Sequence, residues 1–441
     1  MPWALGVVVA DVASAEPVVP VTSVFSSPPS PVGAGARATG LGSAFIGLAD
    51  DATAASWNPG GLTQLQRPEM SVVARATTQL DRIGAGERTA VVNDIETRFT
   101  AQGETDSVAD ASLDYLSAAI PLSLSGRNVV LSLNYQQLYA FQGDYHFHSG
   151  SLDAQTTATV DTHLVQRGTV DGITAAGAIE PIAGLSIGIA LNFLRDGLSH
   201  PFAWRQYYAD SGSLVFSDGS EPVVFDSQSR VTYKNFTGYN TSFGALWQVG
   251  GGVALGAVYK MGFRAHSERV LEFLPSGDKF RDGPRFDFPP AYGAGMSWRP
   301  TDAFTVSTDF TFVDWGQFRS IDASGAETLV TGDRATEHST DGVFTERLGA
   351  EYVWTISSTR VAARGGVFHD PEPSRGAPHS FYGGSVGLGV TLSRMSIDLA
   401  YQGRFGLDVE SSTVATQFIQ IPEVQTDKVQ HTFYLSIVEY W

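Results

Sequence analysis

The chain contains few residue patterns that could support catalysis or bind a metal. His146 and His148 lie two positions apart in the segment YHFHS, so both side chains share one face of an extended segment. Two histidines at this spacing can bind a metal, but exposed loop histidines are the simpler interpretation. We find no Ser/His/Asp arrangement with local context, no phosphate-binding loop and no metal motif. The sequence therefore predicts no catalytic residue, no metal site and no cofactor.

Four charged residues are predicted to lie on the polar, inward faces of strand-like segments: Arg195, Asp309, Asp398 and Arg404. The simplest interpretation is a network of ion pairs in the interior of a barrel. A sharper alternative is that one of the arginines binds the carboxylate of a ligand. Asp110, Asp114 and the other acidic residues of 94–110 could bind divalent cations or bridge lipopolysaccharide, although solvated loop charge is the preferred interpretation.

A compact segment near the start, LADDATAASWNPGGL (48–62), has the composition of short helices. Asp50 or Asp51 can accept hydrogen bonds from the free N–H groups at the start of a helix. Asn58 can do the same, with Pro59 at the first helical position, where no N–H is needed. We therefore expect a small helical element over 33–66, in a chain whose other segments alternate as strands do.

Composition narrows the class of protein. Only 17% of the 441 residues are charged, 11% are aromatic and 47 are Gly. The longest apolar run is also far short of the about 20 residues that a membrane helix needs. Together these features favour an all-β protein, with a membrane barrel as one candidate. The net charge of -18 argues against nucleic acid as a partner. The lack of Cys excludes thiol chemistry and disulfides.

The first residues, MPWALGVVVADVASAEPVVP, contain a short apolar stretch followed by Ala13-Ser14-Ala15, an A-x-A cleavage pattern. Residues 1–15 are predicted to be a signal peptide whose start is truncated, because the basic residues expected before the apolar stretch are missing. A disordered tail is the alternative. Residues 16–66 are expected to form an extended segment followed by the helical element, and residues 67–441 the strands.

From about residue 67, apolar and polar residues alternate with the period of a strand. In 185–193, for example, Leu185, Ile187 and Phe193 share one face, opposite Ser186 and Asn192. About fourteen such segments are predicted, at 68–80, 113–124, 128–142, 159–180, 185–199, 229–249, 252–272, 287–299, 303–317, 342–357, 360–370, 379–393, 394–407 and 428–441.

Two features favour a membrane barrel over a soluble sandwich. The face opposite the apolar residues carries small residues as well as charges, as the interior of a barrel does. Connections also alternate between short turns, as at 124–128 and 357–360, and long polar loops, as at 81–112 and 200–229. An even number of antiparallel strands with this alternation is typical of barrels in the bacterial outer membrane. The last strand ends on Trp441 and is similar to the signal that the barrel-assembly machinery recognises.

The N-terminal segment also resembles a known family. GARATGLGSAFIGLADDATAASWNPGGL is similar to the N-terminal signature of the FadL/TodX outer-membrane transport proteins. The matching residues are Gly33, Ala36, Arg37, Gly40, Gly42, Ala49, Asp50, Asp51, Trp57, Asn58, Pro59, Gly61 and Leu62. Where the family has Asn-Pro-Ala, this chain has Asn58-Pro59-Gly60. The segment FPPAYGAGMSWRPTDAFTVSTDFTFVDW (288–315) is also similar to the family.

The resemblance implies a fourteen-stranded barrel with an N-terminal hatch inside it. It implies passive uptake of long-chain fatty acids or other hydrophobic compounds, with lateral exit through a gap in the wall at a kinked strand, next to Asn58, Pro59, Gly60 and Gly61. Asp50, Asp51 and Arg37 are expected to cap the hatch helices or anchor them to the wall. Two alternatives remain, a non-transporting scaffold for a secretion or surface-attachment system and an outer-membrane enzyme such as a lipase, for which the sequence offers no Ser-His pair.

Overall fold

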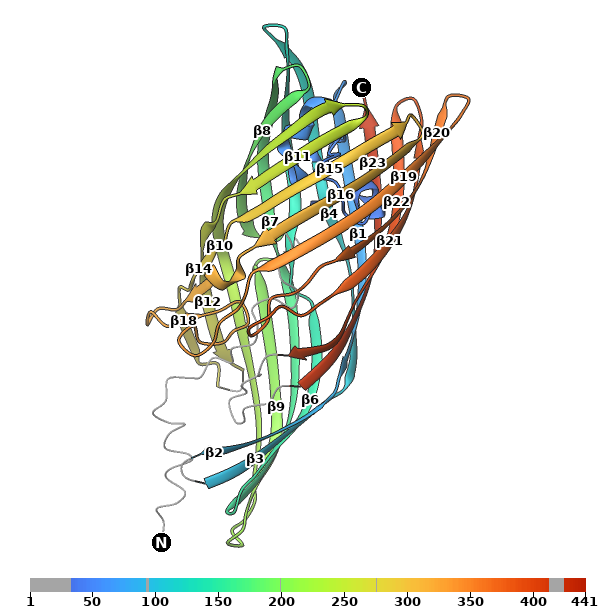
Figure 1. Ribbon diagram of the computed structural model, residues 1–441. Coiled ribbons are helices and arrows are strands. Elements are labelled where there is room, and N and C mark those ends of the chain that lie inside the picture. Colours follow the sequence, from blue (N-terminus) through green and yellow to red (C-terminus); the bar gives the residue numbers. More distant parts are fainter. Residues whose placement is uncertain (1–32, 93–94, 199, 275, 412–423) are drawn as a thin grey trace.

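The computed structural model describes residues 33–92, 95–198, 200–274, 276–411 and 424–441. The predicted signal peptide, 1–15, lies outside these residues. Fourteen antiparallel strands form a closed barrel (Figure 1), and β1 pairs with β23 to complete the circle. Their order around the wall is β1 (Glu69–Ile83), β4 (Thr105–Leu124), β5 (Arg127–Ala140), β7 (Thr156–Ile182), β8 (Leu185–Asp196), β10 (Val223–Gly250), β11 (Val253–Lys260), β15 (Ala291–Thr301), β16 (Phe304–Val313), β19 (Val343–Ile356), β20 (Thr359–His369), β21 (Tyr382–Thr391), β22 (Met395–Ser411) and β23 (Val424–Tyr440).

Each predicted strand corresponds to one of these fourteen, so the fold class is confirmed. Several of the predicted long polar loops contain further strands. They are β2 (Ala85–Val92), β3 (Ile95–Gly103), β6 (Gly143–Leu152), β9 (Trp204–Phe216), β13 (Lys279–Asp282), β14 (Arg285–Phe288), β17 (Arg319–Ile321) and β18 (Glu327–Thr328). The predicted strand at 252–272 is divided into β11 and β12 (Phe263–Phe273). In β3, for example, Glu96, Arg98 and Thr100 are exposed, so this segment lacks the apolar outward face of a membrane strand.

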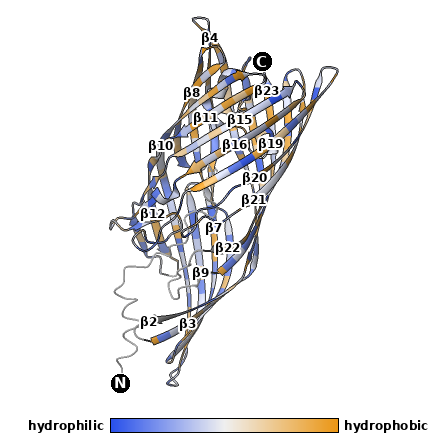
Figure 2. Ribbon diagram, viewed as in Figure 1, coloured by the Kyte–Doolittle hydropathy of each residue, from blue (hydrophilic) through white to orange (hydrophobic). Residues whose placement is uncertain are grey.

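The outer surface of the barrel carries an apolar band (Figure 2). Along β8, Ile187, Ile189, Leu191 and Phe193 all point outward, and Phe193 is 55% exposed. A soluble protein would bury side chains of this size, whereas lipid tails provide an apolar environment for them. The molecule is therefore a transmembrane β-barrel of the outer-membrane type. Among the described residues, no helix has the length and apolar composition needed to cross a membrane.

The two ends of the barrel differ. At one end, here called the short-turn end, neighbouring strands are joined by tight turns such as Ser125–Gly126, and the last strand ends there (Figure 1). At the other, the long-loop end, the extra strands β2, β3, β6 and β9 continue the wall well beyond the apolar band.

Residues 33–66, here called the hatch, lie inside the barrel toward the short-turn end (Figure 1). The hatch contains α2 (Ala36–Gly40), α3 (Ala54–Trp57) and the 3-10 helix η1 (Pro59–Gln64). Its apolar side chains, including Leu41, Phe45 and Trp57, are almost fully buried. Such short helices have little stability alone, so packing against the wall must hold them in place.

Candidate functional site

A chain of buried ion pairs connects the hatch to the wall. The Nε and NH2 groups of Arg37 each donate to one carboxylate oxygen of Glu351 on β19, both at 3.1 Å. Arg364 on β20 donates to the same carboxylate at 2.6 Å and to Asp398 on β22 at 2.6 Å. Arg37 also pairs with Asp50 of the hatch. In this series of alternating charges each charged group has a partner of opposite sign. Charged side chains can be buried only when they are paired in this way.

Asp309 anchors a different part of the hatch. One oxygen of its carboxylate accepts the backbone N–H groups of Phe45 and Ile46, at 2.5 and 2.7 Å. Asp51 serves a local role, because its carboxylate accepts the N–H of Thr53 at 2.8 Å and the Thr53 hydroxyl at 2.6 Å. These bonds form a turn just before α3 rather than a cap on the helix itself.

Glycines of the wall allow the hatch backbone to approach closely. We define the glycine seam as six of the inward-facing glycines that contact the hatch, Gly188, Gly244, Gly256, Gly295, Gly349 and Gly366. They form directly opposed pairs on neighbouring strands, Gly188 with Gly244, Gly256 with Gly295, and Gly349 with Gly366. A Cβ atom at Gly366 would lie 2.2 Å from the Gly42 nitrogen, so a side chain at this position would displace the hatch.

The Asn58-Pro59-Gly60-Gly61 motif lies against this seam. The Asn58 side chain accepts the Gly60 N–H at 3.1 Å, and its Nδ2 donates to the carbonyls of Ala245 on β10 and Ile46, both at 2.9 Å. A Cβ at Gly188 would meet the Pro59 carbonyl carbon at 2.4 Å. The motif therefore caps η1 and joins it to β8 and β10. Outside the same part of the wall lies an apolar hollow of about 700 Å³.

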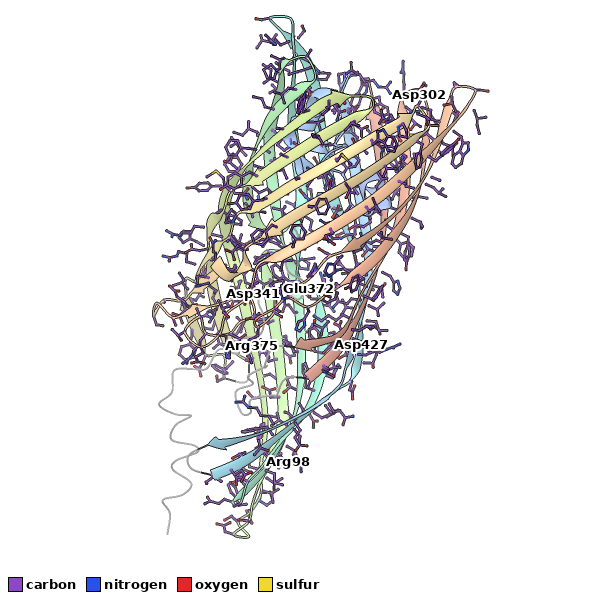
Figure 3. All side chains as sticks on the ribbon, viewed as in Figure 1. Arg98, Asp302, Asp341, Glu372, Arg375 and Asp427 are labelled. Atoms are coloured by element: carbon purple, nitrogen blue, oxygen red, sulfur yellow. The ribbon has the colours of Figure 1, made fainter. Side chains whose placement is uncertain are left out.

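The two predicted arginines of the wall, Arg404 and Arg195, lie on opposite faces of it. Arg404 faces the interior and binds Glu372 (labelled in Figure 3) at 2.7 Å and Asp370 at 3.3 Å. The prediction for Arg195 is wrong. It lies on the outward face of β8, two residues beyond Phe193, and is exposed. The error arises because the even-numbered residues of β8, such as Asn192, face the interior, whereas 195 continues the outward series.

The wall is split between β4 and β5. Their ladder runs from the Leu124–Arg127 pair to the Tyr115–Gln136 pair and ends there. Beyond this point β4 remains paired with β1, and β5 with β7. Each strand has an irregularity at the split, with Leu138 as an extra residue in β5 and Asp114 as an extra residue in β4. A β-bulge of this kind bends its strand, and the two bends separate the neighbours.

A polar cavity of about 210 Å³ opens along the inner side of this split. Its lining combines residues of the hatch, such as Thr39 and Ser43, with residues from both edges of the split, such as Asp110 and Gln137. Arg404, Arg347 and Asp370 form the opposite side. The cavity therefore extends from the hatch to the split between β4 and β5.

A second cavity, of about 90 Å³, lies next to it and has an apolar side. Phe288 and Trp315 line it and belong to a large buried apolar cluster, rich in aromatic residues, in the interior toward the long-loop end. Leu138 and Phe263 also line the cavity and pack against this cluster. Ala55 and Ser56 of the hatch line its other side, with Lys260 as the cationic group. Lys260 donates to the Ser56 carbonyl at 3.3 Å.

Leu138 and Lys260 are not among the residues predicted from the sequence. Gln136 and Gln137, which interrupt the alternation of β5, were the available signal for Leu138, since a bulge shifts the alternation by one residue. Ala55 and Ser56 share the second cavity with Leu138, whereas Asn58-Pro59 lies against β8 and β10. The motif is thus adjacent to a different part of the wall from the one that the resemblance implies.

No family model and no curated protein matches this chain. Solved structures do match over nearly the whole length. A FadL homologue of Pseudomonas aeruginosa aligns with a TM-score of 0.63 and 13% identity, covering 92% of this chain and 98% of the other. The toluene transporters TodX of P. putida (TM-score 0.52, 13% identity, 93% and 99%) and TbuX of Ralstonia pickettii (0.50, 11%, 93% and 99%) also align. The chain therefore has the fold of the FadL/TodX hydrophobic-compound transporters, as its N-terminal segment indicates.

Proposed function

We propose that this barrel is a passive channel through which hydrophobic compounds cross the outer membrane. The observation that carries the proposal is the split between β4 and β5, with a cavity on its inner side that extends to the hatch. A compound that leaves through such a split enters the apolar part of the membrane directly. It avoids the short-turn end, where the hatch fills the interior.

Long-chain fatty acids are the substrate class that the second cavity suits best. Lys260 provides one positive charge at the polar side of this cavity, and aromatic side chains line the other. A carboxylate could bind the ammonium group while the alkyl chain packs against Phe263 and Phe288. The cavity of about 90 Å³ is smaller than the roughly 300 Å³ of typical ligand pockets. Binding of a long chain therefore requires aromatic side chains to move.

Uptake of labelled oleate and labelled toluene, in cells with and without the protein, tests the proposal. We expect uptake of at least one compound to depend on the protein, and Lys260→Met to slow oleate but not toluene. Equal uptake of every hydrophobic compound in both strains would exclude transport. Loss of both compounds in Lys260→Met would exclude a specific role in binding carboxylates.

A non-transporting scaffold is the second candidate, because hatch and aromatic cluster fill most of the described interior. It predicts no protein-dependent uptake. In either case we expect the apolar band to contact membrane lipid and lipopolysaccharide, and the final strand, β23 followed by Trp441, to be recognised by the barrel-assembly machinery. Replacement of Trp441 by Ala should then lower the amount of assembled barrel.

A further inference from the structure

A cluster of histidine and acidic side chains lies on the long-loop end of the wall, where β6 pairs with β7. His146 on β6 and His163 on β7 are directly opposite each other, and their rings stack with centroids 4.0 Å apart. Asp144 lies two residues before His146 and therefore on the same face. Its Oδ1 is 2.8 Å from Nε2 of His163.

The ligand atoms of the three side chains lie close together, and because the two rings are 14° from parallel, one ring must turn for both to bind the same ion. One atom from each of Asp144, His146 and His163 can be chosen so that all lie within 4.8 Å of one another. A tetrahedral Zn²⁺ with bonds of about 2.0–2.1 Å holds its ligand atoms roughly 3.3 Å apart. Small rotations of partly exposed side chains are sufficient to reach this spacing.

A fourth residue orients His146. Asp106 on β4 accepts the backbone N–H of His146 at 2.8 Å through Oδ2, and its Oδ1 lies 3.1 Å from Nδ1 of the same histidine. A proton on Nδ1 then donates to Asp106, which leaves the lone pair of Nε2 for a metal. A carboxylate that holds the second nitrogen of a ligand histidine in this way is the usual arrangement in metal sites.

The cluster lies outside the apolar band, where an aqueous ion can reach it. On the same outward face of β7, Ile173 is 40% exposed within the band, whereas Arg167, Asp161 and Thr159 follow at the long-loop end. Asp144, His146 and His163 are themselves partly exposed.

We propose that Asp144, His146 and His163 bind a Zn²⁺ ion on the outer surface of the barrel, with Asp106 as a positioning residue. Two imidazoles and one carboxylate favour Zn²⁺ over Mg²⁺ and Ca²⁺, which prefer oxygen ligands. Three protein ligands leave one coordination position for water. The ion joins β6 to β7 and stabilises the extension of the wall beyond the membrane.

Equilibrium dialysis of the full-length, tag-free protein in detergent against ZnCl₂ tests the proposal. We expect one Zn²⁺ to bind per chain, and we expect that Ca²⁺ does not displace it. The His146→Ala/His163→Ala double variant should not bind Zn²⁺. Asp106→Asn should weaken binding by about 10–100-fold. Co²⁺ should give the absorption spectrum of a site with nitrogen ligands, and the double variant should lose it.

The matched control is His369→Ala, which removes a partly exposed histidine of β20 that bonds Ser380 and should leave Zn²⁺ binding unchanged. Heat-modifiable migration on gels shows that each variant forms the barrel. Absence of Zn²⁺ binding by the parent protein would overturn the proposal. So would full binding by the folded double variant, or an equal loss of binding in His369→Ala.

Discussion

The hatch meets the barrel wall in two different ways. Along the glycine seam and β19–β22, backbone contacts backbone, and the buried ion pairs of Arg37, Glu351 and Arg364 fix the contact. Toward β4 and β5 the hatch faces a cavity of about 210 Å³, and the strands themselves separate beyond Gln136. The hatch also bonds to β4 and β5 nearer the short-turn end, where Tyr115 donates to the Ala52 carbonyl at 3.3 Å and Asn128 donates to the Thr63 carbonyl at 2.5 Å. Its contact with these strands is therefore loose only at the cavity. We call the first region the tight side and the region of the cavity the loose side.

In the proposed channel the two sides have different roles. The tight side would keep the hatch in place, and the loose side would be the exit of a hydrophobic compound toward lipid. Three substitutions remove contacts from the tight side in order of decreasing effect, a pH titration concerns the long-loop end, and a deletion closes the loose side.

The largest loss of stability is expected from Glu351→Gln. Glutamine leaves the two guanidinium groups of Arg37 and Arg364 without their shared carboxylate. Loss of one partner from a buried ion pair costs about 3–5 kcal/mol. Denaturant unfolding in detergent measures the change in the free energy of unfolding, and planar-bilayer conductance shows whether an ion pore has opened.

The matched control for this variant is Glu87→Gln. Glu87 pairs with Arg98 at 2.6 Å on an exposed strand of the long-loop end (Arg98 is labelled in Figure 3). Exposed ion pairs contribute little, so neither stability nor conductance should change. Equal effects of the two substitutions would mean that the buried chain of charges does not hold the hatch.

A smaller loss of stability is expected from Gly366→Ala. Gly365→Ala, at the neighbouring position, is the control. The new Cβ would lie 2.2 Å from the Gly42 nitrogen at position 366, but 3.9 Å from its nearest neighbour, the Ser385 carbonyl, at position 365. Overpacking costs about 1–3 kcal/mol. Limited trypsin digestion should cleave after Arg37 in the first variant alone. Resistance of both variants to trypsin would argue against close backbone contact at the seam.

Asn58→Ala should destabilise the hatch by about 1–2 kcal/mol, because η1 loses its cap and two carbonyls lose their donor. Gln66→Ala, in which an exposed side chain is removed, is the control. Hydrogen exchange of the amides in 59–64 reports the change. Unaltered protection in Asn58→Ala would show that the motif does not stabilise η1.

The smallest effect concerns pH at the long-loop end. The pKa of His148 is raised, because Asp161 and Glu104 both accept hydrogen bonds from its ring. The stabilising contact is therefore complete below the unfolded-state pKa of about 6.5 and is lost as pH rises through the higher pKa of the folded state. Exposure keeps the effect small. An NMR titration with EDTA present should show the raised pKa, and His148→Gln should reduce the pH dependence of the amide protection factors in β6, once exchange rates are corrected for intrinsic exchange. A pKa of His148 at or below the unfolded value would contradict this assignment.

Most of the fold could be predicted because the apolar side of each strand faces lipid. The alternation of Ile187, Ile189 and Leu191 is therefore clear, and short turns fix the order of neighbours. The strands beyond the membrane were missed, since water on their outer side removes the need for apolar residues there. In β6, for example, the polar residues Asp144, His146 and His148 lie on the outward face.

The candidate site could be predicted only in part. Arg37, Asp50 and Asn58 belong to a local motif, so their types and spacing indicate their role. Arg364 and Glu351 contact the hatch through pairing between distant strands, which no local pattern reveals. Leu138 is the extra residue of the β5 bulge, which is recognised only from the register of β5 against β7. The residue type alone carries no such signal.

Deletion of Leu138 tests the central claim most directly. Without this extra residue β5 can pair in a continuous register with β7 and remain straight beside β4, which closes the split. Deletion of Gly219, in an exposed turn between β9 and β10, is the control. We expect the folded Leu138 deletion to lose most protein-dependent uptake of labelled oleate and toluene, while the Gly219 deletion retains it. Full uptake by a folded Leu138 deletion would contradict exit between β4 and β5.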